Sequence, residues 1–453
     1  MAPTLFFQGG TLVLSDIDQH TPVHPAFRWV KARWRCEGYR YPLLANWLQE
    51  HGIHDQTPRW QRLNLTLHDS RQPHDYQQAA LAAWEAAGRL GSVVLPTGAG
   101  KTFVACHAIQ RVDRSTLVVA PTIDLLHQWY ARLVNAFAAE VGVYYSGEKR
   151  ILPLTVTTYH SVGDLLAAAG NHFKLVIFDE VHHLPAPSWG EAALMAPAPF
   201  RMGLTATYPA PHEQSDGRWR LDELIGPIVY EKRIEELVGQ QLAEYRTVRI
   251  RVDLTPEERQ QYDEQHALYA GYLRAHQLYR YGPRWWLELQ RRSALHADAR
   301  RALLARQQIQ RLLAVATEKF ATLDRLLREH LCEQVLIFTE SNEMVYRISA
   351  TYLIPALTHE TKAAERKEIL EGFQTGRYRA LVTSKVLNEG IDVPEAKVAI
   401  VLGGSAGARE YIQRLGRVLR KVGNRQAVLY EVIVRNTVDV GRAQRRRPRG
   451  ISV

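Results

Sequence analysis

The segment SVVLPTGAGKTFVACHAIQ, residues 92–110, decides how the rest of the chain is interpreted. Its apolar start predicts a buried strand, its two glycines predict a tight turn, and FVACHAIQ predicts a helix. In such a strand–loop–helix, backbone N–H groups point toward a polyphosphate and the positive end of the helix dipole attracts it. The residues predicted to form this nucleotide-binding loop are Thr97, Gly98, Ala99, Gly100, Lys101 and Thr102. Lys101 is expected to reach the β- and γ-phosphates.

Two acids end a second apolar run, LVIFDEVHH, residues 175–183. Asp179 is predicted to hold Mg²⁺ through water, together with the hydroxyl of Thr102. Glu180 is predicted to orient and deprotonate the attacking water. Taken alone, the pair could equally be the acidic start of a helix. Because it follows a phosphate loop, on another parallel strand, we favour ATP hydrolysis.

A link between these acids and a moving partner domain is predicted from two further positions in the sequence. GLTAT, residues 203–207, ends another strand and offers the hydroxyls of Thr205 and Thr207. His182 and His183 are adjacent, so they cannot both face one metal ion from a helix. A coupling role for His182 is therefore favoured over metal ligation.

A second α/β block supplies cationic groups that the first block lacks. In YIQRLGRVLR, residues 411–420, Gln413, Arg417 and Arg420 fall on one helical face. Guanidinium groups from a second domain can stabilise the charge that develops on a transferring phosphoryl group, although a solvated surface helix is the alternative. Upstream, Gly390 and Asp392 are predicted to meet a ribose hydroxyl or the domain seam. Ser384 and Lys385 are predicted to meet backbone phosphates of a nucleic acid.

The ordered motifs RQPHDYQ, LPTGAGKT, VVAPT, TTYHS, DEVHH, GLTAT, SKVLNEGIDVP and YIQRLGRVLR resemble superfamily 2 helicases. More closely, they resemble the XPB family of DNA repair helicases in its compact archaeal or bacterial form, from about residue 5 to about residue 445. This resemblance implies an ATP-dependent DNA helicase or translocase that moves 3′ to 5′ and uses ATP and Mg²⁺. It also implies single- and double-stranded DNA as partners, together with a separate nuclease.

The resemblance implies an α/β fold with two tandem RecA-like parallel-sheet domains, a small N-terminal α+β domain and a helical thumb-like insertion. The expected domains are a damage-recognition-like unit at residues 1–70, an ATP-binding domain at 71–238 and a second helicase domain at 239–453. The second helicase domain is expected to carry the insertion at about 256–320 and a basic C-terminal tail.

The resemblance also assigns roles to single residues. Gln77 matches the glutamine that reads the adenine edge, with Arg71 nearby, while Gly390 and Asp392 match the motif V pair. Arg417 and Arg420 match the arginine fingers. The positions that match motifs gripping the phosphate backbone are Pro121, Thr122, Thr158, Tyr159 and Thr339. An Arg-Glu-Asp triplet that such proteins carry after GLTAT, implicated in strand separation, is missing from YPAPHEQSDGRW at 208–219. ATP hydrolysis and translocation are therefore predicted more firmly than unwinding.

Composition sets outer limits on these expectations. The chain has 453 residues and a net charge of +10, which favours a polyanionic partner. No apolar run approaches the ~18–20 residues that span a bilayer, so a cytoplasmic protein without a membrane partner is expected. The cysteines Cys36, Cys106 and Cys332 are too few and too far apart for an iron–sulfur cluster or a CxxC zinc site, and all three are expected to be buried.

Two alternatives remain open from the sequence. The chain could be an RNA helicase or a restriction-system motor, since the same engine serves these proteins. It could also be an ATP-gated clamp that binds DNA and recruits a nuclease with little unwinding. Separately, Tyr262, Tyr269, Tyr272 and Tyr279 could stack on bases or form the core of a helical hairpin.

Overall fold

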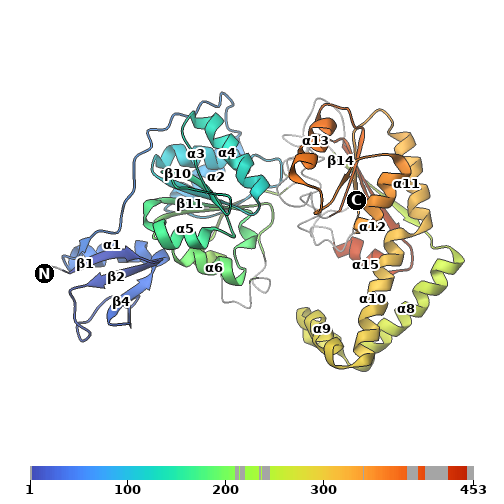
Figure 1. Ribbon diagram of the computed structural model, residues 1–453, viewed down its shortest axis with the longest axis horizontal. Coiled ribbons are helices and arrows are strands. Elements are labelled where there is room, and N and C mark those ends of the chain that lie inside the picture. Colours follow the sequence, from blue (N-terminus) through green and yellow to red (C-terminus); the bar gives the residue numbers. More distant parts are fainter. Residues whose placement is uncertain are drawn as a thin grey trace. The chain divides into compact units, whose positions relative to one another are not determined.

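The computed structural model describes residues 3–209, 214, 220–233, 236, 245–339, 341–384, 396–403 and 427–445. The chain divides near residue 237 into two compact units. The first unit holds a five-stranded and an eight-stranded sheet, and the second holds a six-stranded sheet (Figure 1). The predicted α/β class, with two parallel-sheet domains, a small N-terminal α+β region and a helical insertion, is confirmed.

The N-terminal sheet has the order β3-β4-β2-β1-β5. Its elements are β1 (Thr4–Gln8), β2 (Thr11–Ser15), β3 (Arg28–Val30), β4 (Arg33–Glu37), β5 (His54–Asp55), the 3₁₀ turn Gly38–Arg40 and α1 (Tyr41–Glu50). The β1–β2 hairpin turns at Gly9 and Gly10, where φ values of +56° and +76° favour glycine. Leu5, Leu12 and Leu44 form its core.

The eight-stranded sheet has the order β13-β6-β12-β11-β7-β10-β8-β9. Its strands are β6 (Leu90–Val94), β7 (Thr116–Ala120), β8 (Gly142–Tyr145), β9 (Glu148–Arg150), β10 (Leu154–Thr158), β11 (Leu175–Asp179), β12 (Phe200–Thr205) and β13 (Ile228–Glu231). Neighbouring strands are parallel except for the β8–β9 pair. Every residue of β7, β10 and β11 is buried, as expected for a parallel sheet covered on both faces.

Helices cover both faces of this sheet. They are α2 (Asp75–Ala86), α3 (Lys101–Val112), α4 (Ile123–Phe137), α5 (Val162–Ala169), α6 (Pro187–Leu194) and α7 (Leu221–Leu224), with 3₁₀ turns at Gly170–His172 and Val181–His183. Figure 1 shows α3 and α4 over one face and α5 and α6 over the other. Because the strands are parallel, the carboxyl ends of β6, β7, β10, β11 and β12 meet at one edge, where ligands bind in such folds.

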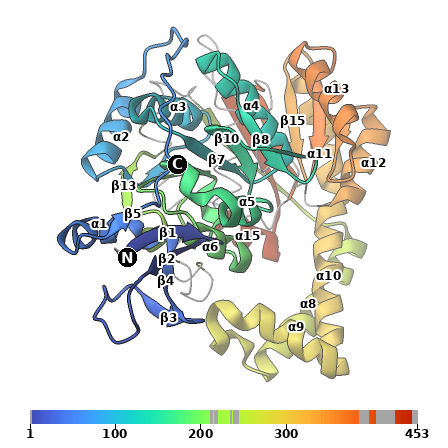
Figure 2. The same cartoon turned by 60° about the vertical axis from the view of Figure 1, so that its left-hand side comes forward.

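Arg201 on β12 ties the N-terminal sheet to the eight-stranded sheet. Its buried guanidinium donates to the carbonyl oxygens of Ala198 (3.2 Å), Leu224 (3.0 Å) and Tyr39 (2.5 Å). Burial lowers the pKa of Arg201 to about 10. Tyr39 precedes α1, and Figure 2 shows the N-terminal strands close to α6. One buried cation therefore joins two segments that are distant in sequence.

The second unit is built on a parallel sheet of order β14-β19-β18-β15-β17-β16. Its strands are β14 (Tyr245–Val252), β15 (Val335–Phe338), β16 (Ala356–Leu357), β17 (Ala380–Thr383), β18 (Val398–Val401) and β19 (Ala427–Val434). The helices packed with it are α11 (Thr317–Glu329), α12 (Asn342–Tyr352), α13 (Ala363–Gln374) and α15 (Val438–Arg445). A fully buried ion pair, Lys319–Asp439 at 3.1 Å, joins α11 to α15.

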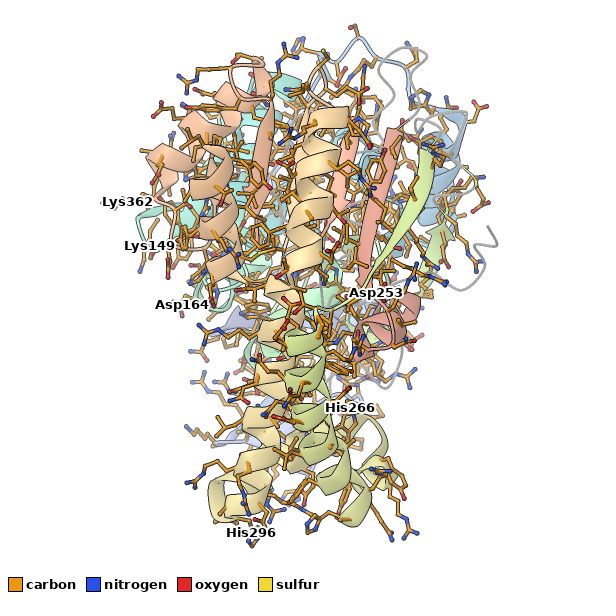
Figure 3. The ribbon with its side chains drawn as sticks, turned by 90° about the vertical axis from the view of Figure 1, so that its right-hand side faces the viewer. Lys149, Asp164, Asp253, His266, His296 and Lys362 are labelled. Atoms are coloured by element: carbon orange, nitrogen blue, oxygen red, sulfur yellow. The ribbon has the colours of Figure 1, made fainter. Side chains whose placement is uncertain are left out.

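The helical insertion of the second unit consists of α8 (Pro256–Ala275), a 3₁₀ segment Leu278–Arg284, α9 (Trp285–Leu295) and α10 (Ala297–Val315). The start of α8 is capped, because Thr255 and Glu258 form a reciprocal capping box. Figure 3 shows α8 and α10 side by side, with His266 on α8 and His296 just before α10. Of the tyrosines that the sequence singles out, Tyr262 is core, while Tyr279 is 64% exposed.

One expectation about the cysteines is wrong. Cys36 and Cys106 are buried, but Cys332 is exposed because it lies in the turn between α11 and β15. Within the described residues, no three histidines, cysteines or acids are grouped as metal ligands. Among the helices that the structure describes, none has the length and apolar composition of a bilayer span.

Candidate active site

The predicted phosphate loop joins β6 to α3 at the carboxyl edge of the eight-stranded sheet. Gly98 and Gly100 have φ values of +86° and +80°, a region that favours glycine. Two side chains of α2 hold the loop, since the Tyr76 hydroxyl and Gln77 Nε2 both donate to the Ala99 carbonyl oxygen at 2.9 Å. A Cβ on Gly100 would lie 2.4 Å from Gln77 Nε2. The loop is therefore fixed by close packing as well as by backbone conformation.

Lys101, the first residue of α3, lies between the loop and the acid pair. Its Nζ donates to the Leu95 carbonyl oxygen at 3.4 Å and lies 3.9 Å from Glu180 Oε1. The side chains of Lys101 and Glu180 are both largely buried. The structure therefore brings the predicted phosphate-binding cation close to the predicted catalytic base.

Asp179 ends β11 and is held by three donors. Trp129 Nε1 donates to Asp179 Oδ2 at 2.8 Å, and the Glu180 N–H donates to Asp179 Oδ1 at 3.0 Å. The Tyr159 hydroxyl donates to the Asp179 carbonyl oxygen at 3.0 Å. Burial, followed by the neighbouring Glu180 charge, raises the pKa of Asp179 to about 6, while the Trp129 and Lys101 contacts act in the opposite direction. The carboxylate is thus oriented by its surroundings before any ligand binds.

Glu180 has an unusual backbone for its residue type. Its φ of +47° and ψ of +53° lie in the left-handed region, which costs on the order of 1–3 kcal/mol for a residue other than glycine. Its Oε2 is buried and has no hydrogen-bond partner among the described residues, although His182 Nδ1 lies 3.4 Å away. Backbone strain of this kind clusters at functional sites, so it favours the predicted role of Glu180.

The predicted coupling residues form one chain of hydrogen bonds. His182 Nδ1 lies 2.9 Å from Thr205 Oγ1, which donates to the Thr207 carbonyl oxygen at 2.8 Å and accepts from the Thr207 N–H at 3.2 Å. The strand end that carries Glu180 is therefore tied to the end of β12. This contact joins the two motifs that the sequence paired, and their role in coupling remains a prediction.

Gln77 and Arg71, the two residues expected near the adenine base, already have hydrogen-bond partners within the protein. Gln77 Oε1 accepts from the His74 N–H at 3.0 Å, so both ends of its amide are in use. Arg71 forms a bidentate pair with Asp69 and lies 5.1 Å from the Phe103 ring centroid. The Arg71 and Arg132 guanidiniums hold the pKa of Asp69 well below its usual range. In this structure Gln77 supports the loop, and its contact with adenine stays a prediction.

Buried oxygen atoms at the site fit a polyphosphate with its cation. Thr97 Oγ1, Thr207 Oγ1 and Glu180 Oε2 are buried without a hydrogen-bond partner in the described part of the chain. Leaving such a group unsatisfied costs about 1–3 kcal/mol, so these atoms favour a ligand that satisfies them. Thr102, in the first turn of α3, and Asp179 are the oxygen-bearing side chains that fit Mg²⁺.

The residues expected to contact nucleic acid differ in their position in the fold and in their burial. Pro121 and Thr122 directly precede α4, and Thr122 Oγ1 caps the helix by accepting from the Leu125 N–H. The side chains of Thr158, Tyr159, Thr339 and Ser384 are buried. Tyr159 is 1% exposed, and its hydroxyl donates to the Asp179 carbonyl oxygen at the end of β11. The contacts of these residues with nucleic acid stay predictions.

Several predicted site residues lie outside the described part of the chain. They are Lys385, Gly390, Asp392, Gln413, Arg417 and Arg420. Most of the stretch after GLTAT, residues 210–213 and 215–219, also lies outside it. The roles inferred for these positions therefore stay predictions.

Two residues at the site were not found from the sequence. Tyr76 and Trp129 contact the loop and Asp179 through single side-chain donors. Both residues look like ordinary core aromatics, because each lies on the apolar face of an amphipathic helix. Only the polar tip of a buried aromatic ring, which needs a partner, could have drawn attention to them.

Two regions of the chain match known protein families. Residues 70–210 match the family described as "Type III restriction enzyme, res subunit", and residues 318–422 match "Helicase conserved C-terminal domain". The crystal structure of the Pyrococcus furiosus Hef helicase domain superposes with a TM-score of 0.53 at 19% identity, covering 83% of this chain and 98% of that chain. At that identity the superposition shows a shared fold.

The sequences of more similar relatives identify the family, which the shared fold does not. The chain is 40% identical to "DNA 3′-5′ translocase XPB2" of Sulfurisphaera tokodaii over 84% of this chain and 86% of that protein. It is 30% identical to "DNA 3′-5′ helicase XPB" of Mycobacterium tuberculosis and to "Putative DNA 3′-5′ helicase Rad25" of Halobacterium salinarum, of which it spans 64% and 57%. By its identity to the Sulfurisphaera protein over most of both chains, this chain belongs to the XPB family.

Proposed function

We propose that this protein is an ATP-dependent DNA translocase or helicase that acts in DNA repair and moves 3′ to 5′. The observation that carries the proposal is the meeting of the phosphate loop, Lys101 and the Asp179–Glu180 pair at one sheet edge. The names of its relatives support DNA as the nucleic acid on which it moves, since these proteins are named DNA 3′-5′ translocase and DNA 3′-5′ helicase.

The residues of the site divide the hydrolytic chemistry among them. Backbone N–H groups of Gly98 to Gly100 and the Nζ of Lys101 would bind the phosphates of ATP. Thr102 and Asp179 would hold Mg²⁺, which when bound neutralises charge on the phosphate oxygens. Glu180, whose Oε2 has no hydrogen-bond partner among the described residues, would orient a water and take its proton.

The second helicase domain is proposed to complete the site. The ribose, or the interface between the two helicase domains, would be contacted by Gly390 and Asp392. The transferring phosphoryl group would be contacted by Gln413, Arg417 and Arg420. Support comes from their spacing on one helical face and from the match of residues 318–422 to a helicase C-terminal domain. Closure of the second domain on the first would then couple hydrolysis to movement.

The domain boundaries at 1–70, 71–238 and 239–453 are also part of the proposal, with the N-terminal sheet as an accessory DNA contact. On the β3–β4 hairpin, Arg28, Lys31 and Arg33 make no ion pair with any described residue. Trp29 packs edge-to-face on Trp34, with ring centroids 5.3 Å apart. A cavity of about 400 Å³ opens beside Trp29 and Arg33. Exposed cations beside aromatic rings suit a nucleic-acid strand. A separate nuclease is proposed as a partner from the resemblance to the family.

The decisive test is ATP hydrolysis by the wild type and by Glu180→Gln, each without nucleic acid and with single-stranded DNA, duplex DNA or RNA. We expect turnover that DNA stimulates and RNA does not, and a loss of at least about 100-fold in the variant, because general base catalysis contributes on the order of 10²–10⁴. Turnover that ignores every nucleic acid, or that survives without Glu180, would overturn the proposal.

Strand displacement measured beside hydrolysis separates a helicase from a translocase. The missing Arg-Glu-Asp triplet after GLTAT leads us to expect DNA-stimulated hydrolysis with poor displacement of an annealed strand. Efficient displacement by the protein alone would show that unwinding does not depend on that triplet here.

A further inference from the structure

The hydrogen bond between Trp129 and Asp179 connects two regions with different expected ligands. Trp129 lies on α4, which begins directly after Pro121 and Thr122, the start of the predicted nucleic-acid contact. Its indole is 2% exposed and donates to the Asp179 carboxylate at 2.8 Å. A buried bond between side chains 50 positions apart in sequence is therefore the direct contact from this helix to the acid expected to hold Mg²⁺.

A second contact from α4 is made about one turn along the helix from Trp129, by Arg132. Arg132 contacts Asp69, which also holds Arg71 over the Phe103 ring of α3. The opposite face of α4 is open, since Ile123 and Tyr130 are exposed. One side of this helix thus faces the nucleotide site, while Ile123 and Tyr130 stay exposed; just before the helix, Pro121 is buried and Thr122 is half-buried.

We propose that Trp129 is a positioning residue through which α4 sets the orientation of the Asp179 carboxylate, so that nucleic acid bound at the start of α4 stimulates ATP hydrolysis. The inference rests on the proposed function, and it adds the contact through which bound nucleic acid would affect the Asp179 carboxylate.

The geometry explains how a shift of α4 would change the orientation of the Asp179 carboxylate. The Tyr159 hydroxyl fixes the Asp179 backbone, and the Glu180 N–H occupies Oδ1. The remaining freedom of Asp179 is the rotation of its carboxylate, which the indole N–H restrains at Oδ2. Hydrogen bonds weaken steeply as they bend, so a small shift of α4 would release or tighten this restraint. Because a single packed contact carries the proposed coupling, one substitution can test it.

Trp129→Phe tests the inference, because it keeps an aromatic ring but removes the N–H. Trp84→Phe is the matched control, since Trp84 is 0% exposed, lies in the same unit and donates its indole N–H at 2.9 Å to the carbonyl oxygen of Arg201. Both variants lose one buried indole hydrogen bond and should lose similar stability in thermal melts. The readouts are basal turnover, DNA-stimulated turnover, the half-activating Mg²⁺ concentration and the Kd for single-stranded DNA.

We expect Trp129→Phe to bind DNA within about twofold of the wild type yet to lose about tenfold in DNA-stimulated turnover, with a smaller basal loss. Its half-activating Mg²⁺ concentration should rise several-fold, whereas Trp84→Phe should keep the wild-type stimulation ratio and Mg²⁺ requirement. An unchanged ratio and Mg²⁺ requirement in Trp129→Phe, or equal losses in both variants, would overturn the inference. Should Trp129→Phe fold poorly, Trp129→His, whose ring N–H can still donate, must recover part of the stimulation.

The same experiment separates failure of the inference from failure of the proposed function. If no nucleic acid stimulates ATP turnover by the wild type, the proposed function fails. The proposed effect of nucleic acid on Asp179 then fails as well. The Mg²⁺ requirement then still decides whether Trp129 positions Asp179. If the wild type is stimulated and Trp129→Phe is stimulated equally, only the inference fails.

Discussion

The carboxyl edges of the two parallel sheets carry different chemistry. In the first unit, the strand ends lead into Lys101, Asp179 and Glu180, and buried oxygen atoms there lack partners among the described residues. In the second unit, β15 and β17 lead into Thr339 and Thr383, whose hydroxyls donate internally to Ser341 O (3.0 Å) and Ser384 O (3.3 Å). Both edges are built from buried strands, and among the residues that the structure describes, charged groups next to unpartnered buried oxygen atoms lie at the first edge.

The difference shows that the fold does not determine the chemistry of an edge. Parallel strands gather their carboxyl ends in both units, but the side chains that follow each strand decide what can bind there. The first edge is therefore expected to be sensitive to single substitutions, and the described hydroxyls of the second edge are expected to be tolerant. Each substitution below tests that contrast.

Lys101→Ala should give the largest effect. Removing the cation that faces the phosphates should lower ATP turnover by about 10²–10³-fold, a magnitude typical of losing one electrostatic contact to a reacting anion. ATPase assays with a thermal shift on adding ATP measure the effect. Lys149→Ala, an exposed position on β9, is the control and should remain active. Similar turnover in both variants would mean that the loop does not hold the phosphates.

Gly100→Ala should have the next largest effect. A Cβ there would meet Gln77 Nε2 at 2.4 Å, in a backbone region that already disfavours alanine, so ATP turnover should fall by about tenfold. Gly88→Ala is the matched control, because Gly88 has a φ of +72° but open space around its Cβ position. Both variants should lose stability, by about 1 kcal/mol from the backbone alone. Equal activity in the two would show that the Gln77 contact does not shape the loop.

Contiguous motifs made the first edge predictable. Thr97 to Thr102 form one strand–loop–helix, and the acid pair follows one strand, so local sequence determined both. The parallel sheets followed from short apolar runs. The contacts between distant positions were not predictable, because Trp129, Tyr159 and Arg201 reach partners far along the chain and each resembles an ordinary core or strand residue.

The expectation that was wrong has a physical reason as well. Cys332 was expected to be buried from its residue type, which carries no information on exposure, yet it lies in a surface turn. The Tyr159 ring packs near Phe178 and Trp189, and its contact with nucleic acid stays a prediction. Burial depends on how the chain closes on itself, and a single sequence does not show that directly.

Thr205→Val should have a smaller, more specific effect. It removes the hydroxyl that links His182 to Thr207, so DNA-stimulated turnover should fall about three- to tenfold while ATP binding changes little. Thr157→Val is the control, since Thr157 is equally buried and its hydroxyl also donates to a carbonyl oxygen, that of Tyr144 at 2.7 Å. Equal losses of stimulation in both variants would point to lost stability rather than lost coupling.

Thr339→Val, in the second unit, should have the smallest effect on activity. The Thr339 side chain is buried and its hydroxyl already donates to Ser341 O, so its removal should cost about 1 kcal/mol in unfolding free energy and change turnover by less than about twofold. Thermal melts and DNA-stimulated turnover, compared with Thr205→Val, measure the contrast between the two edges. A loss of DNA stimulation as large as that of Thr205→Val, at unchanged stability, would contradict it. The hydroxyl of Thr339 would then have to leave its internal partner to meet the track, and the second edge would be as ligand-dependent as the first.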